Sequence, residues 1–244
     1  MTRPTRSAAA RLRALIATLA SLAALQSPAG AAAVDASAST VAPSQATLRE
    51  LAPQLAVGDV VFIRVTARPF KEVAAATGSW TNHVGIVVDT SGAEPVIAES
   101  TVPWSRQTTL AHFVARSQDG RVAVARLTTP LSPDQQRRVV DAAQRRLGVW
   151  YDTGFDLHSR RQFCSRFVRE VLAEATGVQV GDVETFGRLL EQHPEGNQRF
   201  WTLWYLGSIP WQRETVTPAS VLHSRHLTAV FDGRMAAGTS ARLN

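Results

Sequence analysis

The sequence predicts an α+β protein with a mostly antiparallel sheet, because of how its strand and helix patterns are distributed. Segments with strand character gather in the first half of the chain, whereas most segments with helical periodicity follow in the second half. One further strand segment lies near the end. This grouping is typical of α+β proteins, since α/β proteins alternate strands and helices regularly.

The expected strands are short apolar runs that are bounded by turn residues. They lie at 60–63, 83–89, 95–99, 122–127 and 227–231. The second and third runs are separated by a stretch that contains Ser91 and Gly92, which suits a hairpin turn. We therefore expect these two runs to pair as neighbouring antiparallel strands.

The two clearest helices are predicted from their end signals. Ser132 is a good N-cap, Pro133 fits the first helical position, and Gln135 completes a capping box. Residues 163–177 place their apolar side chains on one face and finish with Gly177, a typical C-cap. Weaker helix signals occur at 48–55, 70–77 and from 217 onward.

The N-terminal part of the chain is expected to direct export. Residues 1–33 contain four arginines, an apolar run and a small-residue cleavage site at 31–33, which is the pattern of a secretory signal peptide. Residues 34–46 are rich in Ala, Ser, Thr and Pro and predict a flexible leader. Residues 47–244 then form one domain. We expect a periplasmic or secreted protein without a transmembrane anchor, because no later segment is apolar for about 18 residues.

The charge of the chain argues against nucleic-acid binding. The formal net charge is +6, but four of the positive charges are arginines of the predicted signal peptide, so the rest is close to neutral. The remaining arginines are scattered and form no basic block.

Cys164 is the only cysteine and lies at the start of the helix predicted at 163–177. It has no partner for an intramolecular disulfide, and an unpaired thiol in an exported protein is a candidate for a reactive group. A helix N-terminus stabilises a thiolate through free N–H groups and partial positive charge. The alternative is that Cys164 fills core space, since free cysteine is among the most buried residue types.

His83 and Glu99 are the candidates for a base and for a group that orients it. His83 opens an apolar strand after a flexible turn, and Glu99 closes the next strand. Equal spacing from the hairpin turn would put both side chains on one side, at the open end of the pair. A carboxylate there could hold the imidazole in the required tautomer. Alternatively, both residues are strand ends exposed to water. The other histidines are expected to be solvated; they are His112, His158, His193, His223 and His226.

Four motifs in order resemble the permuted papain-like amidase family, a circularly permuted branch of the NlpC-type cysteine peptidases that is related to the lecithin:retinol acyltransferases. The motifs are GDVVF at 58–62, NHVGIV at 82–87, VIAES at 96–100, and YD at 151–152 followed by FCSRFV at 163–168. The resemblance is good over 57–177 and loose over 217–231. It implies a permuted papain-like fold with a catalytic triad of Cys164, His83 and Glu99.

The chain departs from this family near the triad. Phe163 replaces a common tyrosine, Arg166 a common acidic residue, and Asn82 a common small hydroxyl residue. None of these changes replaces a residue of the triad, but they concern the preference of the protein for its substrate. Candidates for the oxyanion site or the substrate cleft are Tyr151, Trp80, Trp104, Asn82 and Arg166. Tyr151 is expected to be a second oxyanion donor, beside the backbone N–H of Cys164. The alternative is that Tyr151 is a packing residue of the core, which is also the usual role of tryptophans in a domain of this size.

The sequence therefore predicts an exported cysteine hydrolase that cleaves amide or peptide bonds in the cell envelope, with peptidoglycan-type peptides or acyl-amides as substrates. Its mechanism needs no cofactor. One alternative is a lipid or acyl-ester hydrolase or acyltransferase that uses the same triad. Another is a non-catalytic module that binds the envelope. A zinc site is disfavoured because neither CxxC nor HExxH occurs.

Overall fold

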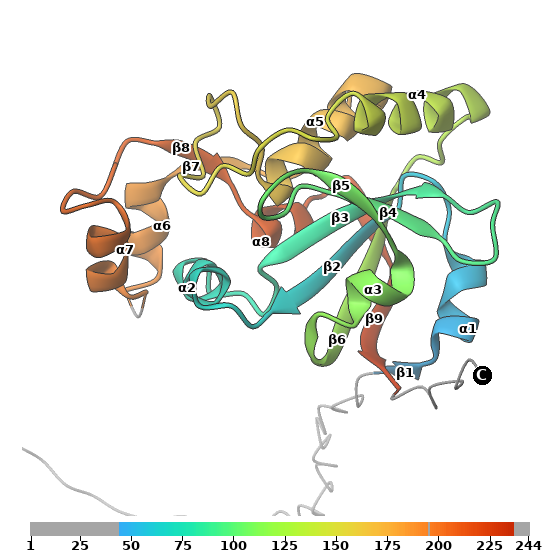
Figure 1. Cartoon of the computed structure of the whole chain (residues 1–244), viewed down its shortest axis with the longest axis horizontal. Helices are drawn as coiled ribbons and strands as arrows, with labels where there is room; N and C mark the ends of the chain where they lie inside the picture. Colours follow the sequence, from blue (N-terminus) through green and yellow to red (C-terminus); the bar gives the residue numbers. More distant parts are fainter. Residues whose placement is uncertain (1–43, 195, 237–244) are drawn as a thin grey trace, which may run out of the picture. The chain divides into compact units, whose positions relative to one another are not determined.

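The computed structural model describes residues 44–194 and 196–236, and the fold is shown in Figure 1. The predicted signal peptide and residues 34–43 of the predicted leader lie outside the described residues. Residues 44–46, the end of that leader, form a strand and so belong to the folded domain. Within the described ranges, no helix is long and apolar enough to cross a membrane.

The fold centres on a seven-stranded sheet with the order β1-β9-β6-β2-β3-β4-β5. Every neighbouring pair is antiparallel except β1 and β9, which are parallel. This arrangement confirms the predicted α+β class. The strands are β1 (Ser44–Ala46), β2 (Val60–Val65), β3 (His83–Asp89), β4 (Val96–Glu99), β5 (Arg106–Thr109), β6 (Ser117–Leu127) and β9 (Leu227–Met235).

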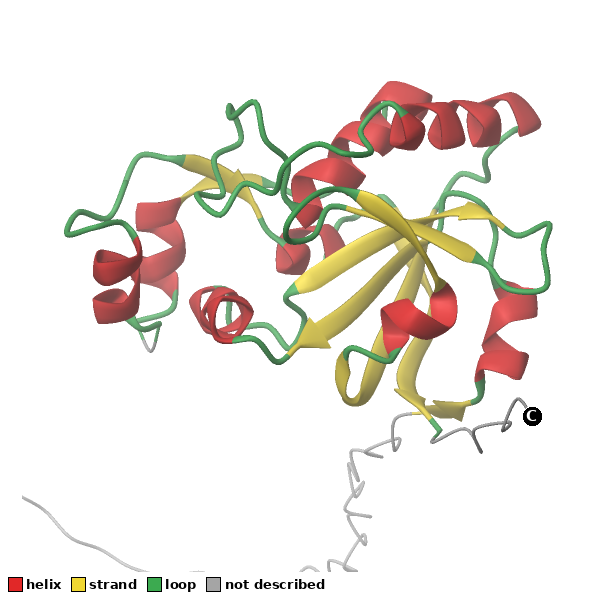
Figure 2. Ribbon diagram, viewed as in Figure 1, coloured by secondary structure: helices red, strands yellow, loops and turns green. Residues whose placement is uncertain are grey.

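Helices cover both faces of this sheet, as Figure 2 shows. Alternate residues of a strand point to opposite faces, so β2 feeds two separate apolar clusters. Val60 and Phe62 pack in the cluster that includes α4 (Pro133–Gln144) and α5 (Cys164–Thr176). Val61 and Ile63 pack in the opposite cluster. That second face is covered by α1 (Leu48–Leu51), the short 3₁₀ helix η1 (Ala52–Gln54) and α3 (Leu110–Val114).

The remaining elements lie beyond one end of the sheet, at the left in Figure 1. A two-stranded antiparallel ribbon joins β7 and β8. The elements of this region are α2 (Arg68–Ala76), β7 (Val183–Thr185), α6 (Phe186–Gln192), α7 (Gln198–Trp204), β8 (Glu214–Val216) and α8 (Pro218–Leu222).

The start of α5 leaves its backbone N–H groups without a side-chain cap. Cys164 is the first residue of the helix, and its N-cap, Phe163, has no side chain that can accept a hydrogen bond. Gly177 ends the helix with φ of 79°, the left-handed conformation that glycine adopts without steric cost. Both predicted ends of this helix are thus confirmed, and the thiol lies beside free N–H donors.

Most of the predicted elements are present, with small shifts at their ends. Residues 83–89 and 96–99 form the expected hairpin, and the capping box of Ser132 and Gln135 opens α4. The strand expected at 122–127 is longer and begins at Ser117. Seven elements were not predicted from the sequence, namely β1, β5, α3, β7, α6, α7 and β8.

Candidate active site

The three residues of the predicted triad all lie in the interior. His83 is the first residue of β3, Glu99 is the last residue of β4, and Cys164 is the first residue of α5. The side chains of His83 and Glu99 have no exposed surface, and Cys164 is 3% exposed. The Nε2 atom of His83 lies 2.6 Å from Oε2 of Glu99. Three positions far apart in sequence thus supply an imidazole, a carboxylate and a thiol in buried positions.

The register of the hairpin explains how His83 reaches Glu99. Ile86 pairs with Ala98, so the same ladder puts Gly85, and not His83, opposite Glu99. The pairs Ile86–Ala98 and Val87–Ile97 are centred on Gly92, so Glu99 lies seven residues after this centre and His83 nine residues before it, and the equal spacing that we expected is absent. His83 is therefore a diagonal neighbour of Glu99 on the same face. The predicted pairing is present, but its expected direct cross-strand alignment is wrong.

Gly85 is needed where these side chains meet. A Cβ atom on this residue would lie 2.6 Å from Cγ2 of Ile97 and 2.9 Å from Cε2 of Phe113. Both distances are too short for real contacts. The ring of Phe113 also packs beside the imidazole of His83, with 5.7 Å between the ring centroids. The absence of a side chain at Gly85, in the NHVGIV motif, therefore allows Ile97 and Phe113 to pack beside His83.

Cys164 is one of the groups that act electrostatically on the imidazole of His83. Nδ1 has no hydrogen bond of good geometry within the described part of the chain. Burial lowers the pKa of His83, but the charge of Cys164, hydrogen bonding with its thiol, and the carboxylate of Glu99 together raise this pKa to about 9. The imidazole is thus influenced by both the thiol and the carboxylate, and it favours its protonated form.

Glu99 also contacts two arginines that the sequence analysis did not identify. Nη2 of Arg116 donates to Oε2 of Glu99 at 2.7 Å, and Nε of Arg106 lies 3.5 Å from Oε1. Burial raises the pKa of Glu99, but the interactions with His83 and Arg116 outweigh it and lower the pKa to about 2. Glu99 is therefore ionised at neutral pH despite its burial.

Tyr151 lies near the thiol, as expected for a candidate oxyanion donor. Its side chain is buried, and the hydroxyl has no hydrogen bond of good geometry among the described residues. Burial and the neighbouring Cys164 raise the pKa of Tyr151 well above its ordinary value. The hydroxyl consequently keeps its proton and can act as a donor.

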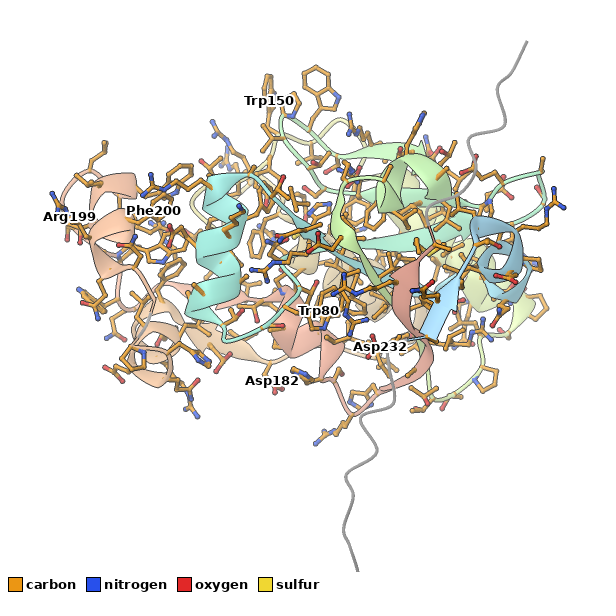
Figure 3. All side chains as sticks on the ribbon, turned by 90° about the horizontal axis from the view of Figure 1, so that it is seen from below. Trp80, Trp150, Asp182, Arg199, Phe200 and Asp232 are labelled. Atoms are coloured by element: carbon orange, nitrogen blue, oxygen red, sulfur yellow. The ribbon has the colours of Figure 1, made fainter. Side chains whose placement is uncertain are left out.

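The other candidate aromatic residues do not line the pocket beside Cys164 in the described structure. The guanidinium of Arg121 lies over the ring of Trp80, 4.3 Å from its centroid. Trp104 is 46% exposed and packs edge-on against Trp150 at 5.6 Å between centroids. Trp150 projects at the periphery of the molecule in Figure 3, whereas Trp80 lies closer to the centre of that view. Trp80 and Trp104, which were predicted for the substrate cleft, thus contact Arg121 and Trp150 and do not line the pocket.

Asn82 and Arg166 hold backbone segments in place. The Asn82 side chain accepts a hydrogen bond from Val65 N at 2.7 Å and donates to Val65 O at 3.0 Å, which extends the pairing of β2 and β3. It also lines the pocket. Arg166 donates to the backbone carbonyls of Ser159 and Arg161 and to the carboxylate of Glu170. Arg166 therefore ties the loop before α5 to that helix, and it is not among the residues that line the pocket.

The pocket beside Cys164 is small and apolar, with a volume of about 30 Å³. Its walls come from Tyr151, Cys164 and apolar side chains of α2, α6 and α7, such as Val73, Leu189 and Trp201. No Asp, Glu, Lys, Arg or His is among its lining residues. Some polar side chains there are bonded to the backbone; for example, Ser165 Oγ donates to Val216 O at 2.7 Å, whereas the hydroxyl of Tyr151 has no such partner among the described residues. The pocket thus suits an uncharged, apolar group.

One of the other histidines also has a carboxylate partner. His158 Nε2 lies 2.7 Å from Oε2 of Glu214, but these two side chains are largely exposed. This pair lies on the surface and resembles the His83–Glu99 pair only in distance. In the part of the chain that the structure describes, no group of three or more His, Cys, Asp or Glu residues is arranged to hold a metal ion.

Comparisons with known proteins identify the family of the chain and similar proteins. Residues 54–231 match the family described as "Permuted papain-like amidase enzyme, YaeF/YiiX, C92 family". The uncharacterized protein YiiX of Escherichia coli strain K12 is 28% identical over 173 residues, which cover 71% of this chain and 84% of that protein. The crystal structure of metalloprotein yiiX from Escherichia coli O157:H7 is similar with a TM-score of 0.68 and 28% identity, covering 74% of this chain and 99% of that one.

Proposed function

Because this chain belongs to the permuted papain-like amidase family, we propose that it is a cysteine hydrolase that cleaves amide or peptide bonds with Cys164, His83 and Glu99 as its triad. The observation that carries the proposal is the position of His83. One ring nitrogen contacts the buried carboxylate of Glu99, and the thiol of Cys164 acts on the same imidazole from the start of α5. This is the order of groups that a thiol nucleophile requires.

The geometry supports a two-step acyl transfer. Nε2–H of His83 donates to Glu99, which leaves Nδ1 to accept the proton of the Cys164 thiol. The thiolate attacks the carbonyl carbon, and His83 then protonates the leaving amine as the carbon–nitrogen bond breaks. Water attacks the resulting thioester, gives its proton to His83, and releases the acid and the thiol. The backbone N–H of Cys164 and the hydroxyl of Tyr151 are the proposed donors to the oxyanion.

We propose an envelope substrate, a peptidoglycan-type peptide or an acyl-amide, which the enzyme meets after export. The signal-peptide pattern at 1–33 supports export. The apolar pocket favours an acyl-amide over a stem peptide, because it offers no charged group to pair with the carboxylates of such a peptide. It also supports the second candidate function, hydrolysis or transfer of a lipid or acyl ester by the same triad.

The decisive experiment compares the wild-type protein with Cys164→Ala on purified envelope fragments and on a panel of peptide amides, acyl-amides and esters. We expect the wild type alone to release product and Cys164→Ala to be inactive. Equal rates for the two proteins would contradict the proposed nucleophile. Activity on esters alone would favour the second candidate. If iodoacetamide does not label Cys164 at neutral pH and the protein binds cell-wall material without cleaving it, the protein is a binding module.

The solved Escherichia coli relative is described as a metalloprotein, so the fit of a metal to this site matters. The triad does not suit one here. Nε2 of His83 is already bonded to Glu99, and both carboxylate oxygens face arginines, whose positive charge opposes a cation. We therefore assign no step of the reaction to a metal.

A further inference from the structure

We infer that Arg116, assisted by Arg106, is a positioning residue that holds Glu99 in the orientation and charge state that His83 needs. This inference rests on the proposed function and extends the triad to a five-residue network. Arg116 and His83 share one carboxylate oxygen of Glu99, Oε2, at 2.7 and 2.6 Å. Arg106 approaches the other oxygen, Oε1, at 3.5 Å. Neither arginine contacts the thiol in the described structure, so both would act through Glu99.

The burial of Glu99 makes such partners necessary. A carboxylate with no exposed surface loses its hydration, and an unpaired one would take up a proton and become neutral. A neutral Glu99 would be a weaker acceptor for Nε2–H, and it would no longer stabilise an imidazolium at His83. The positive charges of Arg116 and Arg106 compensate for the lost hydration and keep the carboxylate charged.

The fold holds each arginine in its place. Arg106 lies directly opposite Glu99 in the pairing of β5 with β4, so its position is set by the strand register. Arg116 follows α3, and its backbone N–H donates to the carbonyl of Phe113. Its guanidinium lies over the ring of Phe113, 5.0 Å from the centroid, and the same ring packs beside His83. Phe113 thus fixes the spacing between the arginine and the imidazole.

The charged groups around Glu99 define the expected effect of pH. His83 faces the carboxylate from β3, Arg106 from β5, and Arg116 from the segment after α3. Two further groups interact electrostatically here: Cys164 with His83, and Tyr151 with both Cys164 and Glu99. Loss of Arg116 has two opposing consequences. It makes Glu99 easier to protonate, and it removes a positive charge that opposes the imidazolium. Protonation of Glu99 is the larger of the two effects, because Arg116 bonds directly to its carboxylate.

Alkylation of Cys164 by iodoacetamide provides a test that needs no known substrate, because the chain has a single cysteine. The rate is measured from about pH 4 to pH 9, the range in which carboxyl and imidazole groups titrate, for wild type, Arg116→Gln and Arg116→Lys. Arg126→Gln is the matched control. Arg126 pairs with the buried carboxylate of Asp59 at 2.6 and 2.7 Å, in a part of the sheet that does not contribute to the triad.

We expect the acid-side fall in the alkylation rate to move to higher pH by about one unit or more in Arg116→Gln, since one pKa unit is a tenfold change in protonation ratio. Arg116→Lys should restore the wild-type profile in part, and Arg126→Gln should keep it. A profile for Arg116→Gln that is unchanged, or that moves to lower pH, contradicts the inference. Circular dichroism at each pH identifies unfolding. If Arg116→Gln does not fold, the profile of Arg116→Lys is compared with that of the wild type instead. A lysine cannot reproduce the planar guanidinium geometry, so its acid-side fall should still lie at higher pH, and an unchanged profile would contradict the inference.

The alkylation test of Arg116 can fail without the hydrolysis test of Cys164→Ala failing, and the reverse is also true. If Cys164→Ala retains full hydrolytic activity, the proposed function fails, whatever the alkylation profiles show. If Cys164→Ala is inactive and the profile of Arg116→Gln matches that of Arg126→Gln, the proposed function stands and the role of Arg116 is rejected. Once a substrate is known, Arg116→Gln should lower kcat and leave KM nearly unchanged, because the arginine does not line the pocket.

Discussion

Glu99 follows Ala98, the residue paired with Ile86, so that an extension of the ladder faces it with Gly85, and it bonds diagonally to His83, two residues before Gly85. The pair therefore depends on a position without a side chain, as well as on the two ionisable groups. Its geometry leads to predictions for single residues that can be measured separately.

Replacement of Glu99 by Gln should lower kcat by about 10²-fold or more, in line with the contribution of a positioned acid–base pair. Glutamine keeps the shape of the side chain but loses the charge that stabilises the imidazolium, and it leaves Arg116 without an ionic partner. The measurement is kcat and KM on the first substrate identified. Glu214→Gln is the control, because it removes a carboxylate from the exposed pair with His158. Equal losses in the two variants would contradict a special role for Glu99.

The contribution of His83 and Glu99 to the free energy of unfolding should be greatest between about pH 4.5 and pH 6.5. The pKa of His83 is raised from 6.5 to about 9, so its contribution is complete below 6.5 and is lost as the pH rises through 9. The pKa of Glu99 is lowered from 4.5 to about 2, so its contribution is present above 4.5 and is lost as the pH falls through 2. Urea unfolding at a series of pH values measures both changes.

The control for this pH dependence is His83→Gln, which should lose the decline between pH 6.5 and pH 9. His158→Gln should retain it, because that imidazole is largely exposed. A stability that increases from pH 6.5 to pH 9 in the wild type but not in His83→Gln would show that the sign for His83 is wrong.

Gly85→Ala should destabilise the protein by about 1–3 kcal/mol, the usual cost of inserting a methyl group into a packed core. The new methyl group would overlap Ile97 and Phe113, so we also expect a displaced Phe113 ring and slower alkylation of Cys164. Gly92→Ala in the turn of the same hairpin is the control, since its nearest contact would be 3.9 Å away. Thermal unfolding and alkylation rates that match between the two variants would refute this.

Val73→Phe should reduce the size of the pocket from the side of α2 and discriminate against substrates that place a small apolar group in it. Val73 is only partly buried, so the larger ring can be accommodated without disrupting the core. Because the pocket has a volume of only about 30 Å³, we expect a higher KM for substrates with a methyl-sized apolar group beside the scissile bond than for substrates without one. An identical preference in wild type and variant would mean that this group binds elsewhere.

Incubation with a chelator such as EDTA, followed by removal of the chelator, should leave the activity and the alkylation rate of Cys164 unchanged. The reason is that Glu99 is already bonded to His83 and Arg116, which leaves no suitable set of ligands at the triad. Metal analysis of the purified protein accompanies the assay. A loss of activity that added zinc restores would contradict the metal-free mechanism.

The positions of His83, Glu99 and Cys164 could be predicted because each one interrupts or begins a regular pattern. His83 and Glu99 are ionisable residues at the ends of apolar runs, and Cys164 starts a helix with a clear C-cap at Gly177. Such signals are local, and local signals survive in a single sequence. The family resemblance then linked the three positions.

The arginines could not be predicted because their position depends on non-local pairing. Residues 106–109 read RQTT, a polar edge strand without alternation, so the position of Arg106 opposite Glu99 has no sequence signal. The register shift after Val87 likewise depends on how the hairpin packs. Arg166 was a candidate for the substrate cleft because it departs from the family pattern, but its side chain bonds to the loop before α5 and does not line the pocket.

The parallel pairing of β1 with β9 has a practical consequence for engineering. Ser44 lies beside Gly233 and Ala46 beside Met235, at the edge of the sheet opposite the edge formed by β5. A linker could therefore connect residue 235 to residue 44, and new termini could be opened in a surface loop between β3 and α5. In the resulting circular permutant, α5 with Cys164 would precede β3 with His83 in the chain. Fusion partners or surface tethers attached at this edge should likewise leave access to the thiol unobstructed.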